Sequence, residues 1–204
     1  MDVPTARVTI DDLLALADRS EWRQLGEIFS TGAPLTPLEG WTRARYLMSY
    51  AGTVPLAPRW IDRLVGKALR RWWQGHRFYD GGREGISNTE VSFRWFWRIA
   101  FFWYPIARGD RGDEVWDFHV RTVPGTTDAR QQVTGLDWYA ASEKFSPRLR
   151  RPAQRFFHWF AWELTRSELV ELAPGGPVLA RITWRIPGGR RWWVTSYYCH
   201  EWLR

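Results

Sequence analysis

Four polar side chains of the sequence lie among aromatic residues, where each could act as an acid or a base. Asp137 and Tyr139 occur in Leu-Asp-Trp-Tyr, His158 in Phe-Phe-His-Trp-Phe, and Glu163 in Trp-Phe-Ala-Trp-Glu-Leu. A carboxyl group packed against indole rings is poorly solvated, a setting that suits general acid–base catalysis. These four residues are therefore the candidate catalytic residues. The alternative for each is a paired structural residue or a charge that faces water.

Other kinds of catalytic machinery are missing from the sequence, which has no Gly-rich phosphate loop and no dinucleotide fingerprint. The histidines stand at positions 76, 119, 158 and 200, and no two of them have the spacing of metal ligands. The single cysteine, Cys199, directly precedes His200, so a strand would point the two side chains to opposite faces. We therefore expect no metal, no organic cofactor and no internal disulfide.

The composition describes one domain with an unusual number of aromatic rings. The chain has 204 residues, enough for a sizeable core, and contains 16 Trp, 11 Phe and 7 Tyr. Such a content predicts either a heavily aromatic core or a cavity with aromatic walls. The net charge of +7 is weak evidence for an anionic partner, because acidic residues are interspersed among the arginines.

The clearest structural pattern is a β-hairpin near the C-terminus. Two runs rich in β-branched and aromatic residues flank the turn Pro187-Gly188-Gly189. In the first run, apolar side chains from Val178 to Ile186 alternate with arginines such as Arg181, which we expect to face water. Such a hairpin is not stable alone, so further strands must cover it.

The rest of the chain predicts those strands and a few helices. Hydrophobic periodicity and capping residues indicate helices after Thr9, after Ser20 and over 58–73. Residues 93–104 fit both templates and are taken as a strand, while 152–162 fit either. Further strands are expected around 41–51, 76–80, 114–123, 131–140 and 168–173.

About eight antiparallel strands that hide many large side chains predict a closed barrel. The expected fold is mainly β, a lipocalin-like or calycin-like barrel with N-terminal and peripheral helices. It forms a single domain, 1–204, with the helices and a connector in 1–40 and the barrel in 41–204. The expected lining of its cavity is Tyr46, Met48, Trp95, Trp97, Trp116, Phe118, Trp138, Trp184 and Tyr198.

A short segment carries a resemblance. Trp73-Gln-Gly-His-Arg-Phe78, followed by Gly85 and Asn88, resembles bacterial lipocalin-like proteins that have Trp-x-Gly-Lys-x-Phe followed by a Gly and an Asn. The stretches 133–139 and 168–185 look like later strands of that family. His76 stands where the family has Lys, and the aromatic stretch 93–104 departs from its pattern. The resemblance implies a fold and no reaction.

These features favour a cofactor-independent enzyme, a cyclase or isomerase that folds a hydrophobic, polyketide-like substrate into a reactive conformer. The comparison with small barrel cyclases of natural-product pathways is by fold analogy. The alternative is a non-catalytic carrier of a hydrophobic small molecule. A nucleic-acid-binding protein is the third hypothesis, and the predicted hairpin argues against it because its arginines and aromatic residues fall on opposite faces.

The sequence also bears on location and partners. The N-terminus has no apolar signal region, and the longest apolar stretch, 91–106, is interrupted by Arg94 and Arg98. We expect a cytoplasmic protein with a small-molecule partner and no membrane partner. The sequence leaves a homodimer open.

Overall fold

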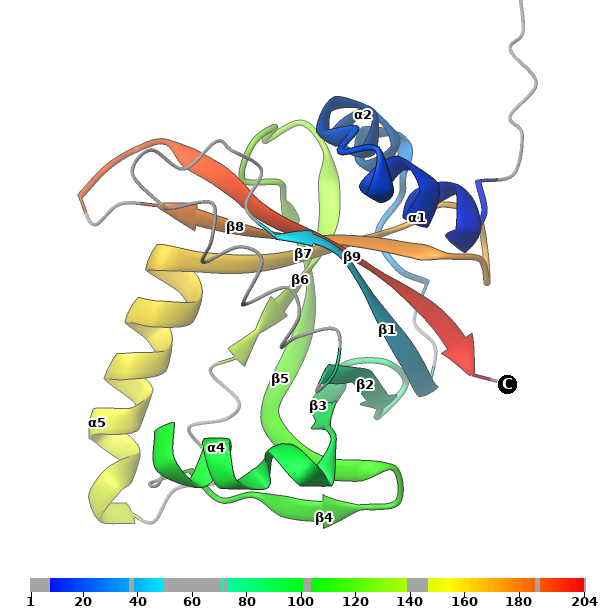
Figure 1. The fold of residues 1–204 in the computed structure, drawn as a ribbon. Helices are drawn as coiled ribbons and strands as arrows, with labels where there is room; N and C mark the ends of the chain where they lie inside the picture. The colour runs from blue at the N-terminus through cyan, green and yellow to red at the C-terminus, as the bar shows by residue number, and fades with distance from the viewer. Residues whose placement is uncertain are drawn as a thin grey trace, which may run out of the picture.

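The computed structural model describes residues 8–36, 39–49, 71, 73–100, 104–138, 147–185 and 188–203. Eight antiparallel strands close into a barrel (Figure 1). They are β1 (Gly40–Ser49), β2 (Trp73–Tyr79), β3 (Glu84–Thr89), β5 (Gly112–Pro124), β6 (Gln132–Asp137), β7 (Thr165–Glu171), β8 (Val178–Arg185) and β9 (Trp192–Leu203).

The strands pair in that order around the barrel. The pairing of β3 with β5 and of β9 with β1 closes the circle. A short ninth strand, β4 (Ala107–Gly109), pairs with β5 outside the barrel. The predicted fold, a mainly β antiparallel barrel of about eight strands with N-terminal helices, is confirmed.

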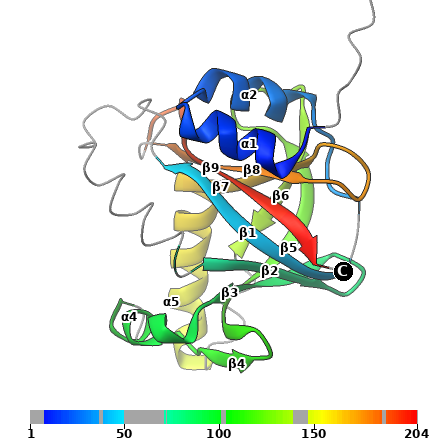
Figure 2. The ribbon, with the colours of Figure 1, turned by 45° about the vertical axis from the view of Figure 1, so that its right-hand side comes forward.

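Two helices, α1 (Ile10–Asp18) and α2 (Trp22–Thr31), cover one outer face of the barrel (Figure 2). A capping box starts α1: the amide of Asp12 donates to the hydroxyl of Thr9 at 3.2 Å, and the amide of Thr9 donates to the carboxylate of Asp12 at 2.9 Å. The helices bury Leu13, Leu25 and Phe29 against outward side chains of the strands. This layer forms one core of the molecule.

The barrel interior forms a second core. It is filled by rings and aliphatic side chains from strands all around the barrel. Because successive side chains of a strand alternate between faces, β8 sends Val178 and Ala180 inward and Leu179 outward into the helical layer. The fully buried or nearly buried interior residues are Phe78, Phe118, Leu136, Leu169, Val178, Ala180 and Tyr198.

Within the aromatic stretch 93–104 that we expected to be a strand, the residues up to 100 are helical. The 3₁₀ turn η1 (Val91–Phe93) leads into α4 (Arg94–Ala100). Helical spacing places Arg94 where its guanidinium forms an ion pair with the buried Asp113 of β5. The side chain of Trp95 is 59% exposed on this helix, so it does not face the barrel interior.

The sequence left residues 152–162 open between helix and strand and predicted a helix over 58–73. Residues 147–164 form α5 (Pro147–His158) and a π-helical turn, η3 (Trp159–Leu164), which settles the ambiguity of 152–162 in favour of helix. Apart from residue 71 and the first residue of β2, the helix predicted over 58–73 lies outside the described residues. No helix in the described part of the chain is both long and apolar enough to cross a bilayer.

Arg181 corrects the expectation that arginines of the hairpin face water. It is buried beneath α2, where its Nε donates to Glu168 at 2.7 Å and its guanidinium lies 3.9 Å from the ring centroid of Phe29. The sequence pattern was correct about which face Arg181 occupies. The prediction failed because helices cover that face.

The tip of the hairpin departs from a strict alternation. The register of β8 and β9 shifts between Ile182 and Thr183, so Arg185 is paired with Trp192 and Trp184 with Trp193. The guanidiniums of Arg166 and Arg185 lie 5.4 and 4.9 Å from the ring centroid of Trp192. Arginine and aromatic side chains therefore meet on one face here, contrary to the predicted separation.

Candidate ligand-binding site

A seam in the barrel wall separates β1 from β2. β1 pairs with β9 over most of its length but with β2 only at Gly40↔Phe78 and Trp41↔Arg77. At the next position the hydroxyl of Thr42 replaces the backbone ladder. It accepts from the amide of His76 at 3.2 Å and donates to the carbonyl oxygen of His76 at 3.1 Å. Beyond this point no described residue of β2 pairs with β1.

Gly75 allows the two strands to separate in this way. Its φ of +141° lies in a region that L side chains rarely adopt, and a Cβ there would lie 2.0 Å from the carbonyl oxygen of Thr42. The register of β2 against β3 also shifts between Trp73 and Gly75. A glycine-dependent bend therefore carries Trp73 and Gln74 away from β1.

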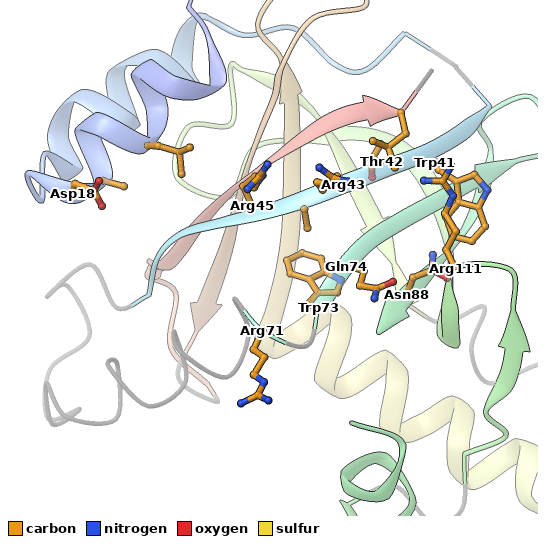
Figure 3. Close-up of a pocket in the computed structure, with 14 residues that line it drawn as sticks. Asp18, Trp41, Thr42, Arg43, Arg45, Arg71, Trp73, Gln74, Asn88 and Arg111 are labelled. Atoms are coloured by element: carbon orange, nitrogen blue, oxygen red, sulfur yellow. The ribbon is translucent and has the colours of Figure 1, made fainter. Parts of the chain in front are cut away.

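A pocket of about 800 Å³ lies along the seam (Figure 3). This volume falls within the roughly 300–1,000 Å³ that is typical of small-molecule sites. The pocket extends from α1 across β1 to the first residues of β2. Its lining residues are Leu14, Ala17, Asp18, Trp41, Thr42, Arg43, Ala44, Arg45, Arg71, Trp73, Gln74, Asn88, Arg111 and Leu203.

The lining of this seam pocket is basic and partly aromatic. It contains four arginines, Arg43, Arg45, Arg71 and Arg111, and one carboxylate, that of Asp18. None of the four guanidiniums forms an ion pair with a carboxylate of the described residues. An excess of unpaired positive charge over apolar walls attracts anions.

Trp41 fixes part of this basic lining. The guanidinium of Arg111 lies 5.5 Å from the centroid of its ring, and that of Arg77 lies 5.4 Å from it. Arg77 is itself held by Glu114, with 3.5 Å between the charged atoms. The stacking holds Arg111 in one place beside the pocket.

Two histidines stand directly behind the lining. The rings of His76 and His200 stack, with centroids 4.8 Å apart and planes 29° apart, and the ring of Trp73 packs against both at 5.1 and 5.6 Å. His200 Nδ1 lies 3.0 Å from the hydroxyl of Thr42, and His76 Nδ1 lies 3.1 Å from the hydroxyl of Ser87. Thr42 thus connects the pocket to the histidine pair.

Burial keeps both imidazoles neutral. It lowers the pKa of His200 to about 3, and burial together with the charge that His200 could carry lowers the pKa of His76 well below its ordinary value. The Thr42 hydroxyl has one proton and two acceptors within reach, the carbonyl oxygen of His76 and His200 Nδ1. In the tautomer in which His200 Nδ1 is the donor to Thr42, His200 Nε2 is an unprotonated nitrogen.

The Nε2 atoms of both histidines are buried and have no hydrogen-bond partner among the described residues. The amide of Asn88, a pocket-lining residue, lacks partners for both Nδ2 and Oδ1 within the same part of the chain. Buried polar groups are nearly always hydrogen-bonded in native proteins. An accumulation of unsatisfied groups beside a pocket therefore points to a ligand or to water.

The donor set does not resemble a metal centre. Across the described residues there is no group of three or more His, Cys, Asp or Glu side chains that could hold a metal ion. Cys199 packs in the helical layer, where burial raises the pKa of its thiol to about 12, whereas His200 stacks on His76. The predicted separation of Cys199 and His200 onto opposite faces is confirmed.

Of the four candidate catalytic residues, the two whose side chains the structure describes, Asp137 and Glu163, do not line this site. Asp137 ends β6 and pairs with Arg121 at 3.1 Å, a half-exposed partner on the outer surface. Glu163 is exposed in η3, where its backbone carbonyl accepts from Arg185 at 2.8 Å. Tyr139 and the side chain of His158, a residue of α5, lie outside the described part of the chain.

The predicted cavity lining divides into several groups. Phe118, Trp138 and Tyr198 lie in the barrel interior, and Trp116 is half-buried with its ring 6.0 Å from that of Trp138. Trp95 and Trp184 are exposed, the first on a helix and the second, at 44%, near the hairpin tip beyond the packed interior. The side chains of Tyr46 and Met48 in β1 and Trp97 in α4 lie outside the described residues.

The pocket is instead formed by residues that strand alternation does not single out. Thr42, Trp73 and Asn88 line it because β2 bends at Gly75, not because of a shared strand face. The signal in the sequence was the Trp-Gln-Gly-His run, in which a glycine interrupts a strand. Comparison of the chain with protein-family models, curated proteins and solved structures found no match in any of the three.

Proposed function

We propose that the protein binds one small amphipathic molecule in the seam pocket. The observation that carries this proposal is the pocket of about 800 Å³ at the break between β1 and β2. Trp41 and Trp73 offer ring surfaces, and Thr42, Gln74 and Asn88 offer polar groups that orient a ligand. The resemblance of residues 73–88 to lipocalin-like proteins belongs to the same proposal, since barrels of that kind hold one ligand. Side chains fill the barrel interior here, so the proposed ligand lies at the seam instead.

Binding is tested by calorimetric titration of the purified protein with a panel of polycyclic and macrocyclic compounds. We expect at least one compound to bind and to raise the thermal unfolding midpoint, because a ligand of the native state stabilises it. Trp73→Ala should weaken that binding at least tenfold. Trp184→Ala is the matched control, since this exposed Trp does not line the pocket. Absence of binding across the panel contradicts the proposal.

The second candidate is turnover of the bound molecule by a cofactor-independent cyclase or isomerase, with a polyketide-like substrate. The observation that favours it is the neutral histidine pair behind Thr42, with both Nε2 atoms unpartnered among the described residues. Orientation of a flexible chain lowers a barrier by roughly 7–11 kcal/mol, and general acid–base help adds roughly 10²–10⁴-fold. In this candidate His200 acts through Thr42, the lining residue whose hydroxyl lies 3.0 Å from His200 Nδ1, since His200 itself is buried behind the lining.

Turnover is tested with the linear precursor of a cyclic product and with protein that has been treated with a chelator. His200→Gln should slow product formation by roughly 10²-fold and leave precursor affinity within a few fold. Asp137→Asn, a change at a residue that does not line the pocket, serves as control. Binding without product above the spontaneous rate identifies a carrier instead.

A further inference from the structure

We propose that the seam pocket selects ligands in which an acidic group, a carboxylate or a phosphate, is attached to a ring system. This inference rests on the proposed binding function and specifies its ligand class. It comes from three features of the lining: its charge, the fixed position of one guanidinium and the unsatisfied amide of Asn88.

The first feature is charge. Arg43 and Arg45 are two residues apart on β1, so they share a face and their Cα atoms lie about 6.7 Å apart. The cross-strand neighbour of Arg43 is Glu201, and the two side chains form no ion pair. The face that carries Arg43, Arg45 and Glu201 keeps a net positive charge, and an anion between the two guanidiniums lowers their mutual repulsion.

The second feature is preorganisation. Arg111 is held on the ring of Trp41, and both line the pocket. A guanidinium offers a planar fork of donors that matches a carboxylate or phosphate in a bidentate arrangement. Because the stack fixes this fork before a ligand arrives, little conformational entropy is lost on binding.

The third feature is independent of charge. Asn88 is only 1% exposed, yet its side-chain Nδ2 and Oδ1 have no partner among the described residues. Nδ2 can donate to an acidic group, and Oδ1 can accept from a ligand hydroxyl. Trp73, on the neighbouring strand, supplies the ring surface for the rest of the molecule (Figure 3). The lining thus offers donors for an anion beside an aromatic wall.

The test uses matched probes in calorimetric titrations of the full chain at low salt: 2-naphthoate, 2-naphthyl phosphate and the neutral methyl ester of 2-naphthoate. We expect one or both anions to bind at least tenfold more tightly than the ester, and this preference to shrink as salt is added. Tighter naphthoate assigns a carboxylate ligand, and tighter naphthyl phosphate assigns a phosphate ligand.

Variants locate the preference in the pocket. Arg43→Gln/Arg45→Gln should reduce anion affinity at least tenfold and leave ester affinity unchanged. Arg151→Gln/Arg155→Gln removes the same charge from exposed positions of α5 and should change neither. Asn88→Asp, which keeps the side-chain shape and adds a negative charge, should weaken the anions and spare the ester.

The outcomes separate this inference from the function on which it rests. Equal affinity of ester and anions overturns the acidic-group preference and leaves ligand binding standing. An anion preference that survives Arg43→Gln/Arg45→Gln but falls in the α5 variant also overturns it, because the anion site is then elsewhere. If none of the probes and no compound of the wider panel binds, both proposals fail.

Discussion

The imidazole rings of His76 and His200 stack 4.8 Å apart, and both side chains are buried. Two neutral rings in this arrangement pack like any aromatic pair. Two imidazolium ions in the same arrangement would repel each other, because the buried site has no water to screen their charges. The folded barrel therefore requires both histidines to be neutral, and their protonation favours the unfolded state.

The pair predicts loss of stability in mild acid. The folded pKa of His200 is about 3, below the roughly 6.5 of an unfolded histidine. The unfolded state then binds more protons, so the stability present above pH 6.5 falls as the pH drops toward 3. The slope should be about 1.4 kcal/mol per pH unit for each such histidine. Urea unfolding at pH 7, 6 and 5 measures it, above the range where ordinary carboxylates titrate.

Matched variants assign the effect. His200→Gln should flatten the profile between pH 6.5 and 5. His119→Gln should not, because His119 is a partly exposed residue 3.7 Å from Glu84. A pH profile that is unchanged in His200→Gln contradicts the account.

The second prediction concerns the Thr42 hydroxyl, on which three hydrogen bonds converge. Thr42→Val leaves the His76 backbone groups and His200 Nδ1 without a partner at nearly constant volume. Each buried unsatisfied group costs about 1–3 kcal/mol, so we expect a loss of at least 2 kcal/mol in the free energy of unfolding. Thr42→Ser, which keeps the hydroxyl, should recover most of it. Chemical denaturation of the wild-type protein, Thr42→Val and Thr42→Ser measures these differences in unfolding free energy.

Gly75 gives a third prediction, with an internal control. Gly75→Ala places a methyl group 2.0 Å from the Thr42 carbonyl oxygen, so the seam must shift, and we expect unfolding or a loss of more than 3 kcal/mol. Gly81→Ala shares the strained backbone, with φ of +64°, but its Cβ meets nothing within 4 Å. It should cost only about 1 kcal/mol. Thermal unfolding of the two variants compares them, and equal losses would exclude a steric role for the seam.

The sequence was sufficient for the barrel and insufficient for the pocket, for physical reasons. Alternation predicts which strand residues face inward, and it placed Phe118 and Tyr198 in the interior. A pocket at a broken ladder depends on pairing between strands far apart in the chain. Thr42 and His76 are 34 residues apart in the sequence. No pattern within either segment indicates that the hydroxyl of Thr42 bonds the backbone of His76.

The misplaced residues have similar causes. Trp95 satisfies both the strand and the helix period, and the ion pair of Arg94 with Asp113 favours the helix. Asp137 does lie in an aromatic stretch, but the strand turns it outward to Arg121 while Trp138 turns inward. The carboxylate of Asp137 is buried, at 7% exposure, but its partner is the guanidinium of Arg121.

The last prediction concerns Glu168 and Arg181, the pair beneath α2. The two side chains are 0% and 6% exposed. Glu168 Oε2 accepts from Arg181 Nε at 2.7 Å, and its Oε1 accepts from the amide of Thr126 at 2.6 Å. Arg181 Nη2 is 2.7 Å from the same Oε2 but out of line for a hydrogen bond, so that contact is electrostatic. Arg181→Met leaves a carboxylate buried without its counter-charge and should cost about 3–5 kcal/mol.

A double variant tests whether Glu168 and Arg181 stabilise the protein as a pair. Glu168→Met/Arg181→Met removes both charges and should be more stable than Arg181→Met alone, because apolar replacement of a buried pair is often neutral or better. Glu27→Gln is the surface comparison and should cost about 1 kcal/mol or less, since Glu27 and its partner Arg23 are 70% and 93% exposed. Urea denaturation of the single and double variants yields the coupling energy. The prediction is contradicted if the loss of unfolding free energy in the double variant equals the sum of the losses in the two single variants. Glu168 and Arg181 would then stabilise the layer under α2 separately, Glu168 through Thr126 and Arg181 through Phe29.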